Sequence, residues 1–295
     1  YNFNIVCFYN SKQIYNKLLP LKHQLKFKLI EIYHSDFKWG DSMSSLDDHN
    51  VDWIIRTSKF VGRDIKNIEK ISSIVPPSIS LDRFKHSKKR KNSIGVVSRI
   101  SSEKNLEYLI DLSKRCPDIT FEVVGDGDHE IKKRLLSAGI SVLGFKDDVE
   151  NYYSFSAFVL PSNNEGVPLT IIEALSNDIP CLAKNTGGIK EILSELNYDW
   201  ELTGDPDVDA KKIKKVLSEN ISSRKIIESK YNQNKNYIKF FEDILYKINS
   251  SKIWSERASP NDFFDRAYCI NLDSRKDKWD SVSKRFLKYG LSVER

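Results

Sequence analysis

The regular alternation of short apolar runs with amphipathic segments constrains the fold of this chain more than any other feature. Each apolar run is bounded by turn residues, and runs of this length predict buried strands. The predicted strands are Ile94–Val97, Phe121–Val124, Ser141–Leu143, Ala157–Leu160 and Pro180–Ala183. Helical patterns alternate with them at Asn105–Arg115, Glu130–Ser137, Val149–Phe155, Pro168–Ser176 and Ile189–Leu193. This order predicts a parallel sheet covered on both faces, where ligands bind beyond the carboxyl ends of the strands.

Length and composition indicate about two domains in a reducing compartment. The chain has 295 residues, of which 40% are hydrophobic and can supply two cores. No apolar run approaches the roughly 20 residues of a membrane span, and no secretory signal is visible. The widely spaced Cys7, Cys116, Cys181 and Cys269 argue against a metal knuckle or a disulfide framework. We therefore expect reduced thiols and a cytoplasmic protein.

The charge pattern argues against a nucleic-acid partner. The net charge of +6 comes from 47 basic and 41 acidic residues, which are well mixed along the chain. A nucleic-acid surface needs clustered basic residues with aromatic residues among them, and the one dense basic run is residues 85–91. An anionic membrane surface that carries a lipid-linked acceptor is a further partner consistent with the charge.

The segment Pro161–Leu175, PSNNEGVPLTIIEAL, carries the strongest functional signal. Pro168 suits the start of a helix, because its fixed φ and missing N–H cost nothing there. The helix should therefore begin near Val167 to Leu169, with Glu165 in the preceding loop. Glu173 then lies about 7.5 Å further along the axis, at about 1.5 Å per residue. Taken alone, the pair also fits a loop glutamate followed by an ordinary solvated helix.

Five sequence blocks, in order and at characteristic spacing, resemble the sugar-donor domain of retaining glycosyltransferases of family 4. The blocks are VVSRISSEKN at 96–105, VVGDGDH at 123–129, VLGFKDDV at 142–149, PSNNEGVPLTIIEAL at 161–175 and NTGGIKEIL at 185–193. The resemblance implies an α/β fold of two facing Rossmann-like domains with parallel sheets, the GT-B type. It implies a nucleotide-sugar donor, such as a UDP-sugar or a GDP-sugar, and no metal or other cofactor.

The resemblance also assigns roles to individual residues. Arg99 and Lys104 match the family's phosphate-binding pair, as a departing diphosphate requires cations where negative charge develops. Glu173 is expected to bind the ribose hydroxyls, and Glu165 to contact the transferred sugar near its reacting carbon. Backbone N–H groups near the helix start are expected to hold the diphosphate. This binding segment comprises Gly166, Val167, Leu169 and Thr170.

Several matches in the sugar-donor domain have a structural alternative. Gly125 and Gly127 either let the backbone approach the sugar donor or permit a turn, and we expect the turn to be the greater part. Asp126 and Asp128 spell a D-x-D, which binds a divalent metal in another transferase architecture, but no metal is expected here. Phe145 lies where the family contacts the nucleobase through backbone groups, and a core aromatic is the alternative.

One match lies in the first domain. His34 occupies the place of a family histidine at the cleft edge, where a neutral imidazole could orient the sugar. A structural histidine at a strand end is the equal alternative. Asp36 is a weaker candidate for the same cleft edge.

The family pattern divides the chain into five parts. Residues 1–84 are expected to form an incomplete acceptor-side domain, which lacks the family's first strand, glycine-rich loop and helix, and residues 85–92 a solvated hinge. Residues 93–249 should form the sugar-donor domain, closed by helices at Val208–Glu219 and Ser222–Asn249, the second packing back toward the first domain. Residues 250–262 read as a linker. Residues 263–295 resemble the opening of glycosyltransferase family 25, or form a strand and helix that decorate the first enzyme.

The predicted function is a retaining, metal-independent glycosyltransferase that moves a sugar from a nucleotide-diphosphate sugar to a glycan or lipid-linked acceptor. Glu165 and His34 are its candidate catalytic residues. Two alternatives stay open at this point. One is a non-catalytic module that binds nucleotide or a partner chain, and the other is a sugar-nucleotide epimerase of the same architecture.

Overall fold

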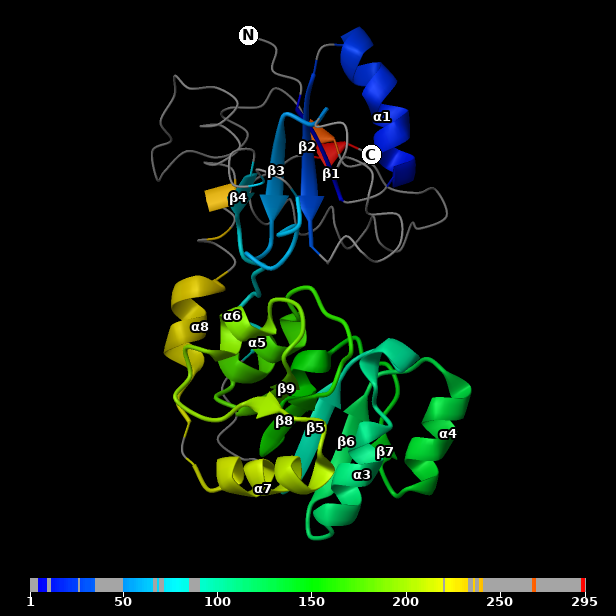
Figure 1. The fold of residues 1–295 in the computed structure, drawn as a ribbon, viewed down its shortest axis with the longest axis vertical. Coiled ribbons are helices and arrows are strands. Elements are labelled where there is room, and N and C mark those ends of the chain that lie inside the picture. The colour runs from blue at the N-terminus through cyan, green and yellow to red at the C-terminus, as the bar shows by residue number, and fades with distance from the viewer. Residues whose placement is uncertain are drawn as a thin grey trace.

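The computed structural model describes residues 5–9, 12–25, 27–34, 50–65, 68, 72–84, 91–219, 221–232, 236, 239–240, 267–268 and 293–294. These residues form two large parallel sheets, one before and one after the expected hinge, as Figure 1 shows, and one small two-stranded pair near the C-terminal end. The predicted α/β class with two Rossmann-like units is confirmed. Residues 35–49, 85–90 and 241–266 lie outside the described part, with Asp36, most of the hinge and the linker among them.

The first sheet has four parallel strands in the order β1-β2-β3-β4. They are β1 Ile5–Tyr9, β2 Lys28–Tyr33, β3 Trp53–Arg56 and β4 Ser72–Ile74. Helix α1, Lys12–Leu25, connects the first two strands. It contains Pro20, and proline is disfavoured inside helices, so the helix is hard to predict from sequence. After β3, residues 57–65 form bends and turns. Gly62 has a left-handed φ of 73° there, which interrupts helical geometry.

The second sheet has six parallel strands in the order β10-β9-β8-β5-β6-β7. All five strands predicted for this unit are present, and β10 adds one edge. The strands are β5 Ser93–Val97, β6 Thr120–Val124, β7 Ser141–Val142, β8 Ala157–Leu160, β9 Cys181–Lys184 and β10 Glu201–Leu202. The chain builds outward from β5 to β7 and then returns to build from β8 to β10. The switch point of this sheet therefore lies between β5 and β8, where open α/β sheets bind ligands.

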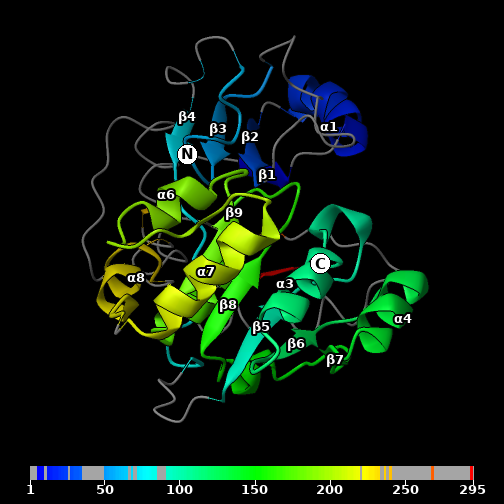
Figure 2. The same ribbon diagram turned by 60° about the horizontal axis from the view of Figure 1, so that its bottom comes forward.

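Helices cover the second sheet, and α3 and α7 lie in front of β5 and β8 in Figure 2. Right-handed crossovers place α5, which packs against α8, on the opposite face. The α-helices are α3 Tyr108–Arg115, α4 His129–Ser137, α5 Leu169–Ser176, α6 Ile189–Leu193, α7 Pro206–Leu217 and α8 Arg224–Lys230. The 3-10 helices are η1 Ser102–Lys104 and η2 Val149–Tyr152. A two-stranded parallel pair, β11 Ala267–Tyr268 and β12 Val293–Glu294, lies in the segment compared with family 25.

The large hydrophobic core belongs to the second unit, whereas the first unit has two smaller clusters among the described residues. The centre of the large core is made of Val96, Leu109, Phe158, Ile172 and Leu182, each at most 1% exposed. Burial of one such side chain contributes about 1.5–3 kcal/mol. Cys7, Cys116 and Cys181 are unpaired, as expected, and Cys269 lies outside the described residues. None of the described helices is long and apolar enough to cross a membrane.

Candidate sugar-donor site

Two loops meet at the switch point of the second sheet. Nζ of Lys104, which ends η1 after β5, lies 2.8 Å from Oε1 of Glu165, which follows β8. Both side chains are largely buried, with 17% and 10% exposed. The structure thus places a cation and a carboxylate, 61 residues apart in sequence, at the carboxyl ends of adjacent strands. The family resemblance assigns Lys104 to the phosphate and Glu165 to the transferred sugar, which are neighbouring groups of one ligand.

Asn105 explains why Lys104 stands at this point. It adopts a left-handed conformation with φ 51°, which closes η1 and turns the chain toward α3. Its Nδ2 donates to the carbonyl of Pro161 at 3.3 Å and so ties the loop after β5 to the end of β8. The predicted helix Asn105–Arg115 therefore starts only at Tyr108, because this turn precedes it.

Arg99 is not brought to the Lys104–Glu165 pair. Its Nη2 lies 2.5 Å from Oε1 of Glu103, and its side chain is 68% exposed. The carbonyl of Glu103 accepts the N–H of Asn163 at 2.8 Å, so this segment is also linked to the loop after β8. Arg99 therefore stays exposed in the loop after β5, where its long side chain can turn toward an incoming anion.

The loop from Glu165 to Pro168 leads directly into α5. Pro168 is the N-cap residue and Leu169 the first helical residue, within the predicted interval. Because proline has no side chain that can cap a helix, the first N–H groups of α5 remain available for an anion. The exposed Leu169 and the partly exposed Thr170 open this helix.

Gly187 and Gly188, which precede α6, pack against this loop. The N–H of Gly188 donates to the carbonyl of Gly166 at 2.6 Å. Gly187 has a φ of 62°, and a Cβ at that position would lie 2.0 Å from the carbonyl oxygen of Glu165. Only glycine permits this close approach.

Glu173 is partly buried and faces the buried Tyr153. Its Oε2 accepts a short hydrogen bond from the hydroxyl of Tyr153. Burial raises the pKa of Glu173, while the Tyr153 hydroxyl and the positive charge of Arg83 lower it. Burial also raises the pKa of Tyr153, so its hydroxyl stays protonated and donates. The expected ribose-binding carboxylate thus has a fixed internal partner.

The glycines after β6 permit close backbone packing, as the turn interpretation expected. A Cβ at Gly125 would lie 1.9 Å from the carbonyl oxygen of Ser98, and one at Gly127 would lie 2.1 Å from that of Ile100. Their φ values of 150° and 152° also favour glycine. The approach is to the loop after β5, which these glycines hold in place.

Both aspartates of the D-x-D have structural partners. Asp128 caps α4 by accepting the N–H groups of Glu130 and Ile131, each at 2.9 Å. Asp126 accepts from Nζ of Lys132 at 3.0 Å, and this hydrogen bond lowers the pKa of its carboxyl. Within the described part of the chain, no group of three or more His, Cys, Asp or Glu side chains could hold a metal ion.

Phe145 and His34 end on the surface of their units. The side chain of Phe145 is 72% exposed, so the core alternative for this aromatic is wrong. His34 follows β2 and packs edge-on against Tyr9, with ring centroids 5.5 Å apart. Desolvation lowers the pKa of His34, which favours the neutral imidazole. No contact joins His34 to Glu165 among the described residues.

Sequence reasoning missed three residues at this site. Tyr153 positions Glu173, Asn163 joins the loops after β5, β8 and β9, and Glu191 reaches the first unit. Asn163 accepts from Nζ of Lys184 at 2.8 Å, and its carbonyl accepts from the Thr186 hydroxyl at 3.3 Å. Asn163 and Glu191 stand inside the quoted blocks, so their position was a signal, but their partners could not be read from sequence.

Known proteins share sequence and fold with this chain. Residues 78–233, more than half of the chain, match the family model described as glycosyl transferases group 1. An uncharacterized glycosyltransferase of Haemophilus influenzae is 32% identical over 135 residues, which are 42% of this chain and 38% of the relative. The UDP-Gal:alpha-D-GlcNAc-diphosphoundecaprenol alpha-1,3-galactosyltransferase of Escherichia coli is 30% identical over 170 residues, 47% of this chain and 42% of the relative. The chain thus spans about two fifths of the length of these relatives.

Solved structures show the same fold. Anabaena HepE in complex with UDP and glucose superposes with a TM-score of 0.66 at 17% identity, covering 83% of this chain and 78% of HepE. The pneumococcal O-GlcNAc transferase GtfA in complex with UDP and GlcNAc gives a TM-score of 0.68 at 18% identity, covering 83% of this chain and 57% of GtfA. Together with the family match over 78–233, these findings show that the chain belongs to the glycosyl transferases group 1 family.

Proposed function

We propose that this chain is the sugar-donor part of a retaining glycosyltransferase of family 4 that uses a UDP-sugar and no metal ion. The contact between Lys104 and Glu165 carries the proposal, because it sets a phosphate-binding cation beside a carboxylate suited to the sugar. The relative from Escherichia coli is named for a UDP-sugar donor and a diphosphate-linked lipid acceptor. We extend both to this chain as its proposed substrate classes.

The chemistry follows from charge. When the bond between sugar and diphosphate breaks, negative charge develops on the phosphate and positive charge on the sugar ring. Lys104, Arg99 and the N-terminus of α5 favour the departing diphosphate. Glu165 favours the positive ring, so its contribution is greatest in the transition state. Since these groups supply the charge that a metal would provide, and Asp126 and Asp128 serve the turn and α4, we propose metal-independent transfer.

Retention of the anomeric configuration is proposed from the placement of the groups. Glu165 and the proposed phosphate-binding groups lie at one edge of one sheet, so we expect them on the same side of a bound sugar. An inverting reaction would instead need a general base on the acceptor side. There His34 is the described candidate, and its lowered pKa suits a neutral residue that orients a hydroxyl.

The experiment that tests the proposal is a calorimetric titration with UDP in the presence of EDTA. Lys104→Gln should weaken binding about tenfold or more, because one charge-assisted hydrogen bond contributes about 1.5–3 kcal/mol. The matched control is Lys212→Gln, since Lys212 is equally exposed at 17% and pairs with Asp199 rather than with a residue of the candidate site. The control should bind UDP like the parent.

Several outcomes would contradict the proposal. They are an absence of UDP binding, equal binding by Lys104→Gln, or binding that requires Mn²⁺. NMR of the product made by the longest active form of the protein tests retention, and an inverted product would contradict the family 4 assignment. Glu165→Gln should lower turnover far more than UDP affinity, whereas an unimpaired variant would remove Glu165 from the mechanism.

A further inference from the structure

Helix α6 of the second unit carries a carboxylate to the first unit. Oε1 of Glu191 accepts the backbone N–H of Phe60 at 2.8 Å, and its Oε2 accepts that of Lys59 at 3.0 Å. Both N–H groups belong to the loop that follows β3. A carboxylate that accepts two neighbouring N–H groups is fixed in one orientation, and such charge-assisted bonds are stronger than neutral ones.

A short rigid segment joins Glu191 to the sugar-donor loop. Glu191 is the third residue of α6, and Gly188 caps that helix. Gly188 donates its N–H to the carbonyl of Gly166, and a Cβ at Gly188 would lie 2.8 Å from Cγ2 of Val167 and 3.1 Å from Oγ of Ser58. The loop before α5 therefore contacts the start of α6, which in turn contacts the loop after β3.

The receiving loop is itself fixed to the first sheet. Arg56, the last residue of β3, is fully buried, and its Nε donates to Oγ of Ser72 at 3.0 Å. Its Nη1 donates to the carbonyls of Lys59 and Val61, both at 3.4 Å. A displacement of Lys59 is thus transmitted to β3 rather than absorbed in a loose turn.

A cavity adjoins this contact. Its volume is about 660 Å³, and residues of both units line it, Ser58, Lys59, Glu191 and Tyr231 among them. Beyond it, the first unit's outgoing chain bonds the end of α8, where the N–H of Ile79 donates to the carbonyl of Tyr231 at 3.1 Å. Because open space lies between these two connections, the angle between the units can change without breaking a packed interface.

We propose that Glu191 is a positioning residue of the transfer reaction, which couples the sugar-donor loop Glu165–Val167 to the acceptor-side unit. This inference rests on the proposed function, because the loop must hold a nucleotide sugar. A ligand at the loop fixes Gly166 and Val167, and through Gly188 it fixes α6 and Glu191. The two-point contact with Lys59 and Phe60 then selects one orientation of the units, in which an acceptor meets the sugar.

Hydrogen exchange at the amides of Lys59 and Phe60, with and without UDP, tests the coupling. In Glu191→Gln one terminal atom becomes an NH₂ group, which cannot accept an N–H, so one of the two bonds is lost. We expect UDP to slow exchange of both amides in the parent. In the variant, exchange should be about tenfold faster and no longer respond to UDP, in line with the loss of one charge-assisted bond.

The matched control is Glu195→Gln. Glu195 lines the same cavity but pairs with Lys230 of its own unit, so this variant should behave like the parent. In the transfer assay Glu191→Gln should lower kcat and leave the KM for the sugar donor nearly unchanged, whereas damage to the donor site itself would raise that KM. Should Glu191→Gln fail to fold, Glu191→Asp gives the same test, since the shorter side chain cannot span both N–H groups.

Equal protection of the two amides by UDP in the parent and in Glu191→Gln would overturn the proposal. So would exchange that ignores UDP in a parent chain to which calorimetry shows UDP bound. A parent that binds no UDP contradicts the proposed function instead. Exchange in the ligand-free chain then still reports whether Glu191 joins the units, because that contact needs no ligand.

Discussion

The carboxylate of Glu173 is buried against Tyr153, and this burial has a cost that depends on pH. Burial raises its pKa, and the like charge of Glu150 acts in the same direction, against Tyr153 and Arg83. A group whose folded pKa is raised contributes stability below its unfolded pKa and loses that contribution as the pH rises through the folded value. At neutral pH the ionised Glu173 therefore lowers the free energy of unfolding.

Glu173→Gln should consequently stabilise the ligand-free chain at pH 7 to 8, because the amide oxygen accepts the Tyr153 hydrogen bond without a buried charge. The gain should shrink as the pH falls toward 4.5, the ordinary value for glutamate. UDP affinity should fall about tenfold if Glu173 forms the proposed charge-assisted bonds to the ribose. Urea titrations across this pH range, paired with calorimetry, measure both effects.

Glu150→Gln is the control with the opposite sign. The hydrogen bond from Arg83, 2.7 Å from Oε2, lowers the pKa of Glu150. Its stabilising contribution is present above the unfolded pKa and is lost as the pH falls through the folded value. This variant should therefore be slightly less stable than the parent at neutral pH. A Glu173→Gln variant that matches the parent at every pH would contradict the burial argument.

At the residue scale, sequence predicted which side chains stand at strand ends but not which of them meet. Lys104, Glu165 and Glu173 were expected at the site because the sequence blocks that contain them resemble those of family 4. The Lys104–Glu165 contact depends on the neighbouring positions of β5 and β8, which the order of the sheet decides. Tyr153 could not be singled out from sequence, because a tyrosine before a buried strand reads as an ordinary core residue. Only the structure shows its hydrogen bond to Glu173.

At the scale of elements, the positions of α5 and α6 depend on one glycine. Gly187→Ala should lower the free energy of unfolding by several kcal/mol and weaken UDP binding, because its Cβ would collide with the Glu165 carbonyl at 2.0 Å. The left-handed conformation alone costs about 1–2 kcal/mol. Chemical denaturation measures the first effect and calorimetry the second.

Gly139→Ala separates strain from collision. Gly139 also has a left-handed φ, 79°, but a Cβ there meets nothing within 4 Å. The free energy of unfolding of Gly139→Ala should fall only by the strain cost of about 1–2 kcal/mol, and its UDP affinity should be unchanged. Similar losses in both variants would show that the loop before α5 yields easily, and that the contact does not hold the donor loop.

Element boundaries differed from prediction where a local turn or cap decided them. The predicted helix Val149–Phe155 is the 3-10 helix η2, because Tyr153 and Phe155 turn inward to the core. Asp205 caps α7 through the N–H groups of Asp207 and Val208, so the helix begins two residues before the predicted Val208. Of the predicted helix Ser222–Asn249, α8 spans Arg224–Lys230 and ends at Tyr231. Most of the remainder lies outside the described residues.

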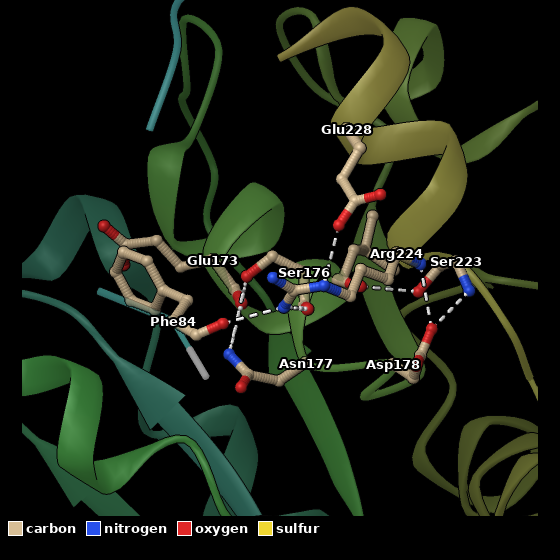
Figure 3. A network of polar contacts seen from close by, with 9 residues as sticks. Phe84, Glu173, Ser176, Asn177, Asp178, Ser223, Arg224 and Glu228 are labelled. Atoms are coloured by element: carbon tan, nitrogen blue, oxygen red, sulfur yellow. Dashed lines mark hydrogen bonds and ion pairs between the residues drawn. The ribbon is translucent and has the colours of Figure 1, made fainter. Parts of the chain in front are cut away.

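The end of the first unit at Phe84, α5 and α8 are held together by Arg224, as Figure 3 shows. Its Nη1 donates to the carbonyls of Phe84 and Ser176, at 2.7 and 2.6 Å, and its Nε to Glu228 at 2.9 Å. Asp178 accepts the N–H groups of Ser223 and Arg224, which fixes the start of α8. Sequence could not predict this three-way junction, because its members lie up to 140 residues apart.

At the scale of the whole molecule, the two units differ in how much apolar surface they bury. The second unit has six strands with helices on both faces, whereas the described part of the first has four strands and one helix. Apolar runs in the sequence predicted the second sheet, because parallel strands read as apolar runs, whereas the first sheet was expected from the family resemblance. Their relative orientation could not be predicted, since it depends on single contacts such as Glu191 and Arg224.

This asymmetry predicts that UDP will separate the thermal unfolding of the two units. At 100 times its dissociation constant, a ligand adds about 2.7 kcal/mol to the stability of the unit that binds it. For a unit of this size that corresponds to roughly 5–10 °C. Peptides from β8 and β9 should shift by this amount when hydrogen exchange is measured during heating. Peptides from β2 and β3 should unfold earlier and shift much less, because UDP reaches them through contacts such as that of Glu191, and in Glu191→Gln their shift should be smaller still. A common shift of all peptides would mean that the units unfold as one, and a shift confined to β2 and β3 would place the nucleotide on the wrong unit.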